Sequence, residues 1–397
     1  MPLDLTKVAG QVDRMVTSLK NGVADKQQRL NYALETLGGE AVDIAKLQRK
    51  IAASKTTWLV AGLVERLNAH FPAPPLPDEF TVMATDGSHI EVDRHQAARC
   101  YLINIGNVVL HYGAHPEAVL DSVPSLYAGD DDLVMTPPDG KGREQVVVGP
   151  LLGLKRGVDE CRHLAELAAK LPPQRPALAL LDGTLVLWGL EAYPEFITQS
   201  LLEQGFLTCL EQMRKLGSHL AMASYISSPR GTDVVNALRV AICPNDPPDC
   251  DRYCAGQEER GCEGVAGVLD QELFFNVLGQ GERSALFMSQ SSVVRQHYGE
   301  HHIYFFYLRV EDEIARVEVP QWVARDEKRL NLVHSLVLDQ CRRGQGYPVA
   351  LSEAHEQAVV READRQNFWQ LVESLLVEEH LPTPTSGKGR SKRTRWI

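Results

Sequence analysis

The sequence predicts an α/β protein, in which helices flank a mixed sheet and a helical extension precedes it. Three observations predict this class. Apolar residues recur at helical spacing within residues 1–71. Runs rich in β-branched and aromatic residues follow, FTVMAT from residue 80 and ARCYLINIGNVVLHYG from residue 98. Further along the chain, strand-like runs alternate with helical ones, which is typical of helices packed on a sheet.

The elements follow in order along the chain. The proline-rich stretch FPAPPLPDEF at 71–80 ends the helical extension, because proline lacks an amide donor and restricts the residue before it. Residues 113–149 are predicted to be an irregular excursion. Helices are predicted over about 151–171 and 194–216, and the last third of the chain returns to helix. Strands are predicted at ALALLD (177–182), HLAMASYIS (219–227), IYFFYLRV (303–310) and RVEVP (316–320). The domain prediction is a helical region at 1–75, a main domain at 80–375 with a cysteine-rich insertion at 243–262, and a basic flexible tail at 381–397.

Composition restricts the function classes. With 397 residues, of which 44% are hydrophobic, the chain can bury a large core. The net charge of −11 argues against a uniformly basic DNA-coating protein but leaves room for a locally basic channel. No segment approaches the roughly 18 uninterrupted apolar residues of a membrane span. The start, MPLDLTKVAG, lacks the basic and apolar regions of a signal peptide, so we expect a cytoplasmic protein.

One phrase occurs twice. MATDGSHI contains Asp86 and LALLDGTL contains Asp182, and each aspartate follows a strongly apolar run and precedes glycine and a hydroxyl residue. Such runs are typical of strands covered on both faces. We expect each strand to end at its Asp-Gly pair, where glycine permits a sharp turn or the close approach of a ligand. If the two strands are neighbours, both carboxylates converge at one edge of the sheet.

Two converging carboxylates repel each other, and a divalent cation relieves that repulsion. Mg²⁺ or Mn²⁺ prefers oxygen ligands and usually retains water and phosphate oxygens. A pair of ions about 3.5–4 Å apart clamps the attacking water and the leaving oxygen of a phosphodiester. Asp-Gly is also a common turn dipeptide, so one phrase alone indicates only a turn. The matched pair predicts a metal site for phosphodiester chemistry.

A third carboxylate is expected from the helix GLKRGVDECRHLAELAAKL. Its apolar stripe includes Leu154, Val158 and Cys161. At 3.6 residues per turn Glu160 flanks that stripe, whereas Asp159 and Glu166 lie nearly opposite it. Glu160 is therefore chosen over Glu166 as the third ligand. The competing interpretation is an i, i+4 ion pair between Glu160 and Arg156.

Four motifs together resemble the NurA-domain nuclease family. They are TDGS at 85–88, LDGT at 181–184, RVEVP at 316–320 and GYPVALSEAHEQA at 346–358, in the family's order. The resemblance covers about residues 80–370. It implies an RNase H-like sheet, Mn²⁺-dependent cleavage of DNA from 5′ ends, dimerisation, and work with a HerA-type hexameric ATPase. It places the family's two motif aspartates on Asp86 and Asp182, with Glu160 as the helix glutamate.

The resemblance also places a catalytic tyrosine and histidine on Tyr347 and His355. Pro348 disfavours a helical conformation at Tyr347, and Ser352 is expected to cap a helix that begins at residue 353. His355 would then occupy the first turn, where the helix dipole favours a neutral imidazole that can ligate a metal or accept a proton. A surface histidine and a buried tyrosine with a satisfied hydroxyl are the alternatives.

Basic residues suggest where DNA lies. Arg230, Arg239, Lys155 and Arg156 are candidate phosphate contacts, with solvated surface charges as the alternative. The tail SGKGRSKRTRWI carries five basic residues and no acid. It is interpreted as a flexible arm that attracts nucleic acid or an acidic partner surface, or that merely aids solubility.

A cysteine-rich segment departs from the simplest form of the family. Cys243, Cys250, Cys254 and Cys262 have the spacing C-x6-C-x3-C-x7-C in a stretch rich in Pro, Asp and Gly. Four thiolates can bind Zn²⁺ or a four-iron cluster, and this spacing fits neither common pattern. An iron–sulfur cluster is slightly favoured, because structural zinc sites more often contain a C-x2-C pair. Four unligated thiols are the alternative.

The primary hypothesis is a metal-dependent DNA nuclease in which Asp86, Glu160 and Asp182 ligate the metal and His355 ligates it or acts as base. An actin-like phosphotransferase and a non-catalytic scaffold for a DNA translocase are the rivals. The chain contains no GxxxxGK[ST] phosphate loop, which weighs against the phosphotransferase. The N-terminal helices are expected either to dimerise the protein or to dock an ATPase.

Overall fold

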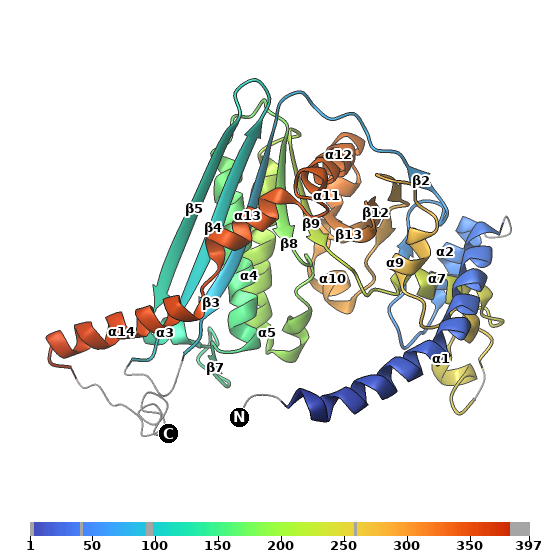
Figure 1. Cartoon of the computed structure of the whole chain (residues 1–397), viewed down its shortest axis with the longest axis horizontal. Helices are drawn as coiled ribbons and strands as arrows, with labels where there is room; N and C mark the ends of the chain where they lie inside the picture. Colours follow the sequence, from blue (N-terminus) through green and yellow to red (C-terminus); the bar gives the residue numbers. More distant parts are fainter. Residues whose placement is uncertain (1–3, 40–42, 93–97, 258–259, 382–397) are drawn as a thin grey trace. The chain divides into compact units, whose positions relative to one another are not determined.

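The computed structural model describes residues 4–39, 43–92, 98–257 and 260–381 (Figure 1). The predicted basic tail lies outside them, apart from residue 381. The chain divides into two compact units. The first comprises Met1–Pro72, Ser227–Ser291 and Tyr304–Val317, and the second comprises Ala73–Ile226, Ser292–Ile303 and Glu318–Ile397. The domain boundaries expected from the sequence stay predictions.

The strands of the second unit form a mixed array. Their order is β9 (Leu220–Ile226), β8 (Ala177–Asp182), β3 (Phe80–Ile90), β4 (Tyr101–Tyr112) and β5 (Glu117–Tyr127). β9, β8 and β3 are parallel, whereas β3, β4 and β5 are antiparallel neighbours. The mixed α/β class predicted from the sequence is confirmed, and three antiparallel strands followed by parallel ones agree with an RNase H-like sheet.

Helices cover both faces of β3 and β4. Helix α4 (Pro150–Ala169) and helix α13 (Val349–Ala358) both pack on these strands. A side chain at Gly87 would point to α4, and one at Gly106 would point to α13. Gly106 pairs with Asp86, whose side chain lies on the opposite face of the strand from Gly87, so the two helices lie on opposite faces of the sheet. Because helices cover both faces, every residue of β3 from Phe80 to Thr85 is buried.

The remaining elements of the second unit connect and flank this sheet. A 3₁₀ turn (Trp188–Ala192) leads into a continuous helical stretch, and a π-helical segment (Thr198–Leu207) lies between its two α-helical parts. A further 3₁₀ turn spans Gly299–His301. The other helices and strands are α3 (Asp130–Leu133), β6 (Val134–Met135), β7 (Gln145–Val146), α5 (Glu195–Ile197), α6 (Thr208–Lys215), α10 (Ser292–His297), α11 (Gln321–Ala324), α12 (Glu327–Arg343) and α14 (Glu362–Glu378).

The first unit is mainly helical and has its own core. Buried side chains from α1, α2, α7 and the short strands form one apolar cluster, which includes Leu37, Leu47, Leu238 and Phe287. The predicted helical N-terminal region is thus confirmed. The elements are α1 (Leu5–Gly38), α2 (Ile44–Ala53), β1 (Gly62–Leu63), β2 (His70–Phe71), α7 (Asp233–Ile242), α8 (Cys250–Tyr253), a 3₁₀ turn (Glu263–Val265), α9 (Asp270–Phe275), β10 (Arg283–Ser284), β11 (Phe287–Met288) and most of β12 (Ile303–Val310). Strand β13 (Glu313–Pro320) is divided between the units after Val317.

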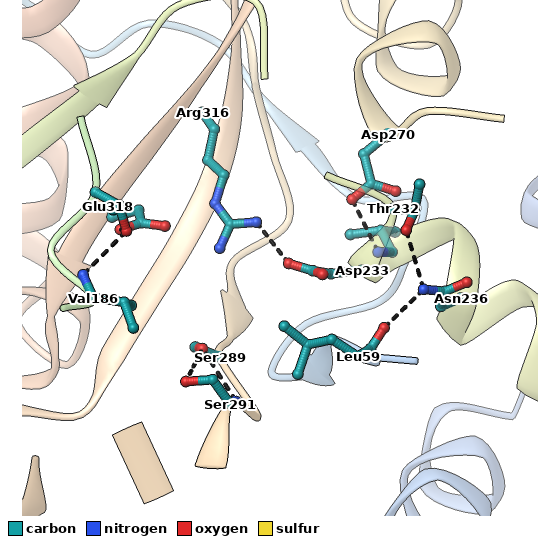
Figure 2. Close-up of polar contacts among 12 residues, drawn as sticks. Leu59, Val186, Thr232, Asp233, Asn236, Asp270, Ser289, Ser291, Arg316 and Glu318 are labelled. Atoms are coloured by element: carbon teal, nitrogen blue, oxygen red, sulfur yellow. Dashed lines mark hydrogen bonds and ion pairs between the residues drawn. The ribbon is translucent and has the colours of Figure 1, made fainter. Parts of the chain in front are cut away.

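Buried charges fix the start of α7 in the first unit (Figure 2). Arg316 Nη1 lies 2.7 Å from Asp233 Oδ2. Asp270 is fully buried and accepts hydrogen bonds from the Val235 amide at 2.8 Å and from the Tyr307 hydroxyl at 2.7 Å. Burial, followed by the charge of Asp233, raises the pKa of Asp270 to about 6. Asp270 therefore caps α7 from a distant part of the sequence.

Two expectations about secondary structure are wrong. The helical prediction for 1–71 fails after Ala53, because the stretch around WLVAGLVERL is irregular chain with the two-residue strand β1, and it contributes buried Val60 and Ala61 to the core. A short apolar run does not by itself distinguish helix from extended chain. The irregular excursion at 113–149 contains β5, an edge strand whose exposed positions hide the usual alternation. The helix expected at 194–216 is present, interrupted by the π-helical segment.

No helix within the described ranges is long and apolar enough to cross a membrane.

Candidate active site

Asp86 and Asp182 occupy neighbouring positions on two parallel strands. The register of β3 and β8 pairs Thr85 with Leu181, so the next residue on each strand is one of the two aspartates. Equivalent positions on adjacent strands point to the same face. The convergence expected from the repeated phrase is therefore present at the point where the ladder between β3 and β8 ends.

The two phrases differ in local structure, which corrects one expectation. β8 ends at Asp182, and Gly183 adopts a φ of +80°, a conformation that favours glycine. β3 does not turn after Asp86 but continues to Ile90, paired throughout with β4. The long antiparallel partner explains this, because β4 supplies backbone hydrogen bonds beyond the end of β8. Gly87 therefore serves close approach and not a turn.

Glu318 anchors the turn that follows Asp182. Its Oε2 accepts a hydrogen bond from the Thr184 hydroxyl at 2.8 Å and another from the Leu185 amide at 2.9 Å. The Thr184 hydroxyl in turn accepts a hydrogen bond from the Val186 amide at 3.0 Å. The motif RVEVP thus contributes a buried carboxylate that holds the Asp182 turn, a role that sequence reasoning missed. The signal was the acid within an otherwise apolar strand.

Glu160 reaches the same edge from the α4 face. A Cβ on Gly87 would lie 2.6 Å from Glu160 Oε1, so the glycine leaves the room that the carboxylate fills. The Thr85 hydroxyl donates to the Glu160 backbone carbonyl at 2.9 Å and fixes this turn of α4 on β3. Arg156 Nε lies 3.0 Å from Glu160 Oε1, so the i, i+4 pair also forms. Asp159, expected on the outer face, is instead buried beside Lys155 and Arg162.

The three carboxyl groups influence one another. Burial raises the pKa of Glu160 to about 8, opposed by Arg156 and reinforced by the charges of Asp86 and Asp182. Burial also raises the pKa of Asp182, and the hydrogen bond from Tyr347 opposes this while the charge of Asp86 adds to it. A strongly shifted acid such as Glu160 within a cluster of carboxylates is typical of functional sites.

His355 lies beside Asp86 but not where the sequence predicted within its helix. Its Nδ1 is 2.8 Å from Asp86 Oδ2, and its side chain is 63% exposed. α13 begins at Val349, directly after Pro348, so Ser352 is inside the helix and His355 is in its last turn. The dipole argument for a neutral imidazole at a helix start therefore does not apply.

Close packing of α13 on the sheet brings His355 to Asp86. Gly106, the β4 partner of Asp86, would place a Cβ only 2.2 Å from the Ala354 carbonyl oxygen. The carbonyl of Ala358 at the end of α13 accepts hydrogen bonds from the Ser88 hydroxyl at 2.5 Å and from the Asn104 amide at 2.8 Å. Ser88, the hydroxyl residue of the first phrase, thus positions the helix.

Tyr347 completes the group. It precedes α13, and its hydroxyl donates to Asp182 Oδ1 at 2.9 Å. Its ring meets that of buried Tyr225 edge to face, with centroids 5.5 Å apart. Burial, with the charge of Asp182, raises the pKa of Tyr347 far above its ordinary range, so the hydroxyl keeps its proton. The five residues predicted for the site, Asp86, Glu160, Asp182, Tyr347 and His355, are brought together within the second unit.

The donor set fits a divalent cation. Glu160 Oε1 is buried and, among the described residues, receives no hydrogen bond of good geometry, although Arg156 is its ion-pair partner. Three carboxylates and one imidazole are hard oxygen and nitrogen donors, of the kind that Mg²⁺ and Mn²⁺ accept. Burial raises the pKa of Glu160 most, and a bound cation would offset both this burial and the added repulsion from Asp86 and Asp182.

The candidate phosphate contacts have different surroundings. Lys155 bonds Asp159 at 3.2 Å and lies over the Tyr127 ring, and Arg156 pairs with Glu160 beside the site. Arg239 and Arg230 belong to the first unit. Arg239 stacks over the Trp58 ring at 4.2 Å, whereas Arg230 is exposed. Contact of these four residues with DNA stays a prediction.

A second acidic group lies elsewhere in the second unit. Glu195, Glu203 and His297 place one ligand atom each within 4.8 Å of the others. Glu195 and Glu203 are exposed, and His297 is half-buried. Exposed acidic groups are common without an ion, so we assign it no role.

The fold and the cluster of acids define the class as a nuclease-family protein, and comparison with known families agrees. The model of the NurA domain family matches residues 80–360. The chain therefore belongs to the NurA family, a family of nucleases. All four motifs lie within the matched range. A search of curated proteins found no match.

Proposed function

We propose that this protein is a divalent-metal-dependent deoxyribonuclease that cleaves phosphodiester bonds of DNA, from 5′ towards 3′ ends, in DNA end processing and repair. The observation that carries the proposal is the meeting of Asp86, Asp182 and Glu160 at the end of the β3–β8 ladder. The direction of cleavage is supported by membership of the NurA family.

Four side chains would hold the cation: Asp86, Glu160, Asp182 and His355. When bound, Mn²⁺ or Mg²⁺ supplies positive charge that polarises a phosphate oxygen and lowers the pKa of a bound water. The protein's own contribution is to fix the ligands. β3 and β8 set the two aspartates, and α4 delivers Glu160 over Gly87.

His355 and Tyr347 have supporting roles in this proposal. Because Nδ1 of His355 faces Asp86, its Nε2 is the nitrogen that ligates the cation or takes the proton of the attacking water. The Tyr347 hydroxyl stays protonated and orients Asp182 by donating its one hydrogen to that carboxylate.

We propose DNA as the substrate and, from family membership, a HerA-type hexameric ATPase and a second copy of the chain as partners, with work in the cytoplasm. Exposed apolar side chains along α1 support an interaction surface on the N-terminal helix. They include Leu5, Val12, Met15, Leu19 and Val23.

A nuclease assay tests the activity. Duplexes labelled at the 5′ or the 3′ end are incubated with the full chain, with and without Mn²⁺. We expect cleavage that requires the cation, with early release of the 5′ label. Asp182→Asn should reduce the rate by at least about 100-fold, because a metal ligand is lost.

Glu166→Gln is the matched control, since Glu166 is an exposed acid on the same helix as Glu160. It should cleave at the normal rate, whereas Glu160→Gln should not. Equal activity of the Asp182→Asn variant, with an unchanged circular dichroism spectrum, would exclude the proposed site. Early release of the 3′ label would reverse the polarity while leaving the metal site standing.

A further inference from the structure

The cysteine-rich segment of the first unit folds so that its four cysteines face one cavity. Cys243 follows the end of α7, Cys250 opens α8, Cys254 follows α8, and Cys262 precedes the 3₁₀ turn. All four line a cavity of about 10 Å³ together with Trp58. The fold therefore brings Cys243 and Cys262, which are 19 positions apart in the sequence, to the same cavity.

These thiols are withdrawn from solvent although the segment is polar. Cys262 is 6% exposed, and the other three are half-buried. None of the four is in a disulfide.

Backbone contacts hold the segment against helix α2 and its neighbours. The amide of Cys250 donates to the Lys55 carbonyl at 2.9 Å, and the Lys55 amide donates to the Pro248 carbonyl at 2.8 Å. The Lys50 ammonium donates to the Cys243 carbonyl at 2.6 Å. The site is thus tied to the N-terminal helices before any metal is considered.

A cation also borders the cavity. Arg239 lines it and stacks over Trp58 with its guanidinium carbon 4.2 Å from the ring centroid. A positive group beside a cluster of thiolates compensates their excess negative charge. This position explains Arg239 better than a phosphate contact does, because its guanidinium is already engaged.

We propose that Cys243, Cys250, Cys254 and Cys262 bind a thiophilic metal centre that cross-links the segment from the end of α7 to residue 262. Each thiol that becomes a ligand loses its proton to solvent. Four thiolates suit a tetrahedral Zn²⁺ or a four-iron cluster. Among the described residues, no three of these sulfurs lie within 4.8 Å of one another, so a single tetrahedral ion would require the cysteines to move closer together.

Metal analysis of the full chain, purified without chelator and without oxygen, tests the proposal. We expect about one zinc per chain or about four irons per chain with a visible absorption band. The measured metal content distinguishes zinc from iron, and binding of either metal supports the proposed site. The double variant Cys250→Ser with Cys254→Ser should lose metal by about tenfold or more.

Cys100→Ala is the matched control, because Cys100 is a buried thiol in the other unit. It should keep the metal. If the double variant does not fold, thiol titration of the unchanged protein decides instead. We expect the four thiols to react slowly until a strong chelator is added. Metal at background level, with rates that the chelator leaves unaltered, would overturn the proposal.

Discussion

Two glycines determine where the site residues of the second unit can lie. Gly87 leaves space for the end of the Glu160 side chain, and Gly106 leaves space for the backbone of α13. The group that faces Gly87 and the group that faces Gly106 differ in how easily they can move. A carboxylate at the end of a flexible side chain can move aside, whereas a helix backbone moves only with the whole helix. The two positions should therefore respond differently to an added methyl group.

Gly106→Ala should lower the free energy of unfolding by about 1–3 kcal/mol, because its Cβ would overlap the Ala354 carbonyl of α13. Displacement of α13 also moves His355, so nuclease activity should fall. Urea titration measures the first effect. Gly157→Ala, on α4 with open space around it, is the control and should be neutral or stabilising. Unchanged stability and activity of Gly106→Ala would refute the close packing.

Glu160 links the site to pH. Its pKa in the folded protein is about 8, against an ordinary value of 4.5, because burial disfavours the charged form. In the absence of metal and between these two pH values, the Glu160 carboxyl is mostly ionised in the unfolded chain but stays protonated in the folded chain. The free energy of unfolding should therefore fall as the pH rises from about 5 to about 8. Glu160→Gln should flatten this dependence.

A bound cation should favour the ionised form of Glu160, so that metal binding releases the proton of this carboxyl group. Calorimetric titration with Mn²⁺ at pH 7, in two buffers of different ionisation enthalpy, counts the protons released on binding. We expect about one proton fewer for Glu160→Gln than for the unchanged protein. The control Glu166→Gln should release the same number as the unchanged protein. Identical release by all three proteins would exclude Glu160 as a ligand.

At the scale of elements, the turn after β8 depends on one buried acid. Glu318→Ala would leave the Thr184 hydroxyl and the Leu185 amide without this acceptor, at a cost of about 1–3 kcal/mol for the buried Leu185 amide. Thermal unfolding should show the loss. Glu318→Gln retains a carbonyl oxygen at the same place and should recover part of the stability. If alanine and glutamine behave alike, the turn is held by other contacts.

The sequence alone predicts the type of several helices and strands better than it predicts where they begin and end. The strand identity of FTVMAT and ALALLD follows from their apolar runs, and so does the pairing of two Asp-Gly phrases. The continuation of β3 through Asp86 could not be predicted, because it depends on pairing with β4. In α13, Ser352 suggested a cap, but Pro348 and the buried face of Leu351 and Ala354 start the helix earlier. Tertiary packing decided between two acceptable local signals.

Charged side chains were the hardest to predict. A basic residue can pair with an acid, stack on an aromatic ring or bind a phosphate, and the residue type alone does not distinguish these roles. Lys155 has Tyr127 and Asp159 as partners, and Arg239 has Trp58. Glu318 was missed for the same reason, since its partners lie far away in the sequence. The two aspartates of the site were easier to predict, because Asp86 and Asp182 occur in the same repeated sequence phrase.

At the scale of the whole molecule, α1 is the main exposed apolar surface that we assign to self-association. Light scattering of the full chain should give the mass of a dimer. The double variant Met15→Lys with Leu19→Lys should give a monomer, because it places charge in the exposed apolar stripe. Thr17→Lys adds charge to another side of the helix and should remain dimeric. A dimer in all three proteins would place the interface elsewhere.

The cation proposed for the β3–β8 edge can be tested for directly. Crystals soaked in Mn²⁺ and measured by anomalous diffraction should show a peak among the carboxylates of Asp86, Asp182 and Glu160, and Asp182→Asn should weaken it. A peak only at Glu195, Glu203 and His297, or no peak in crystals of the active protein, would contradict the account.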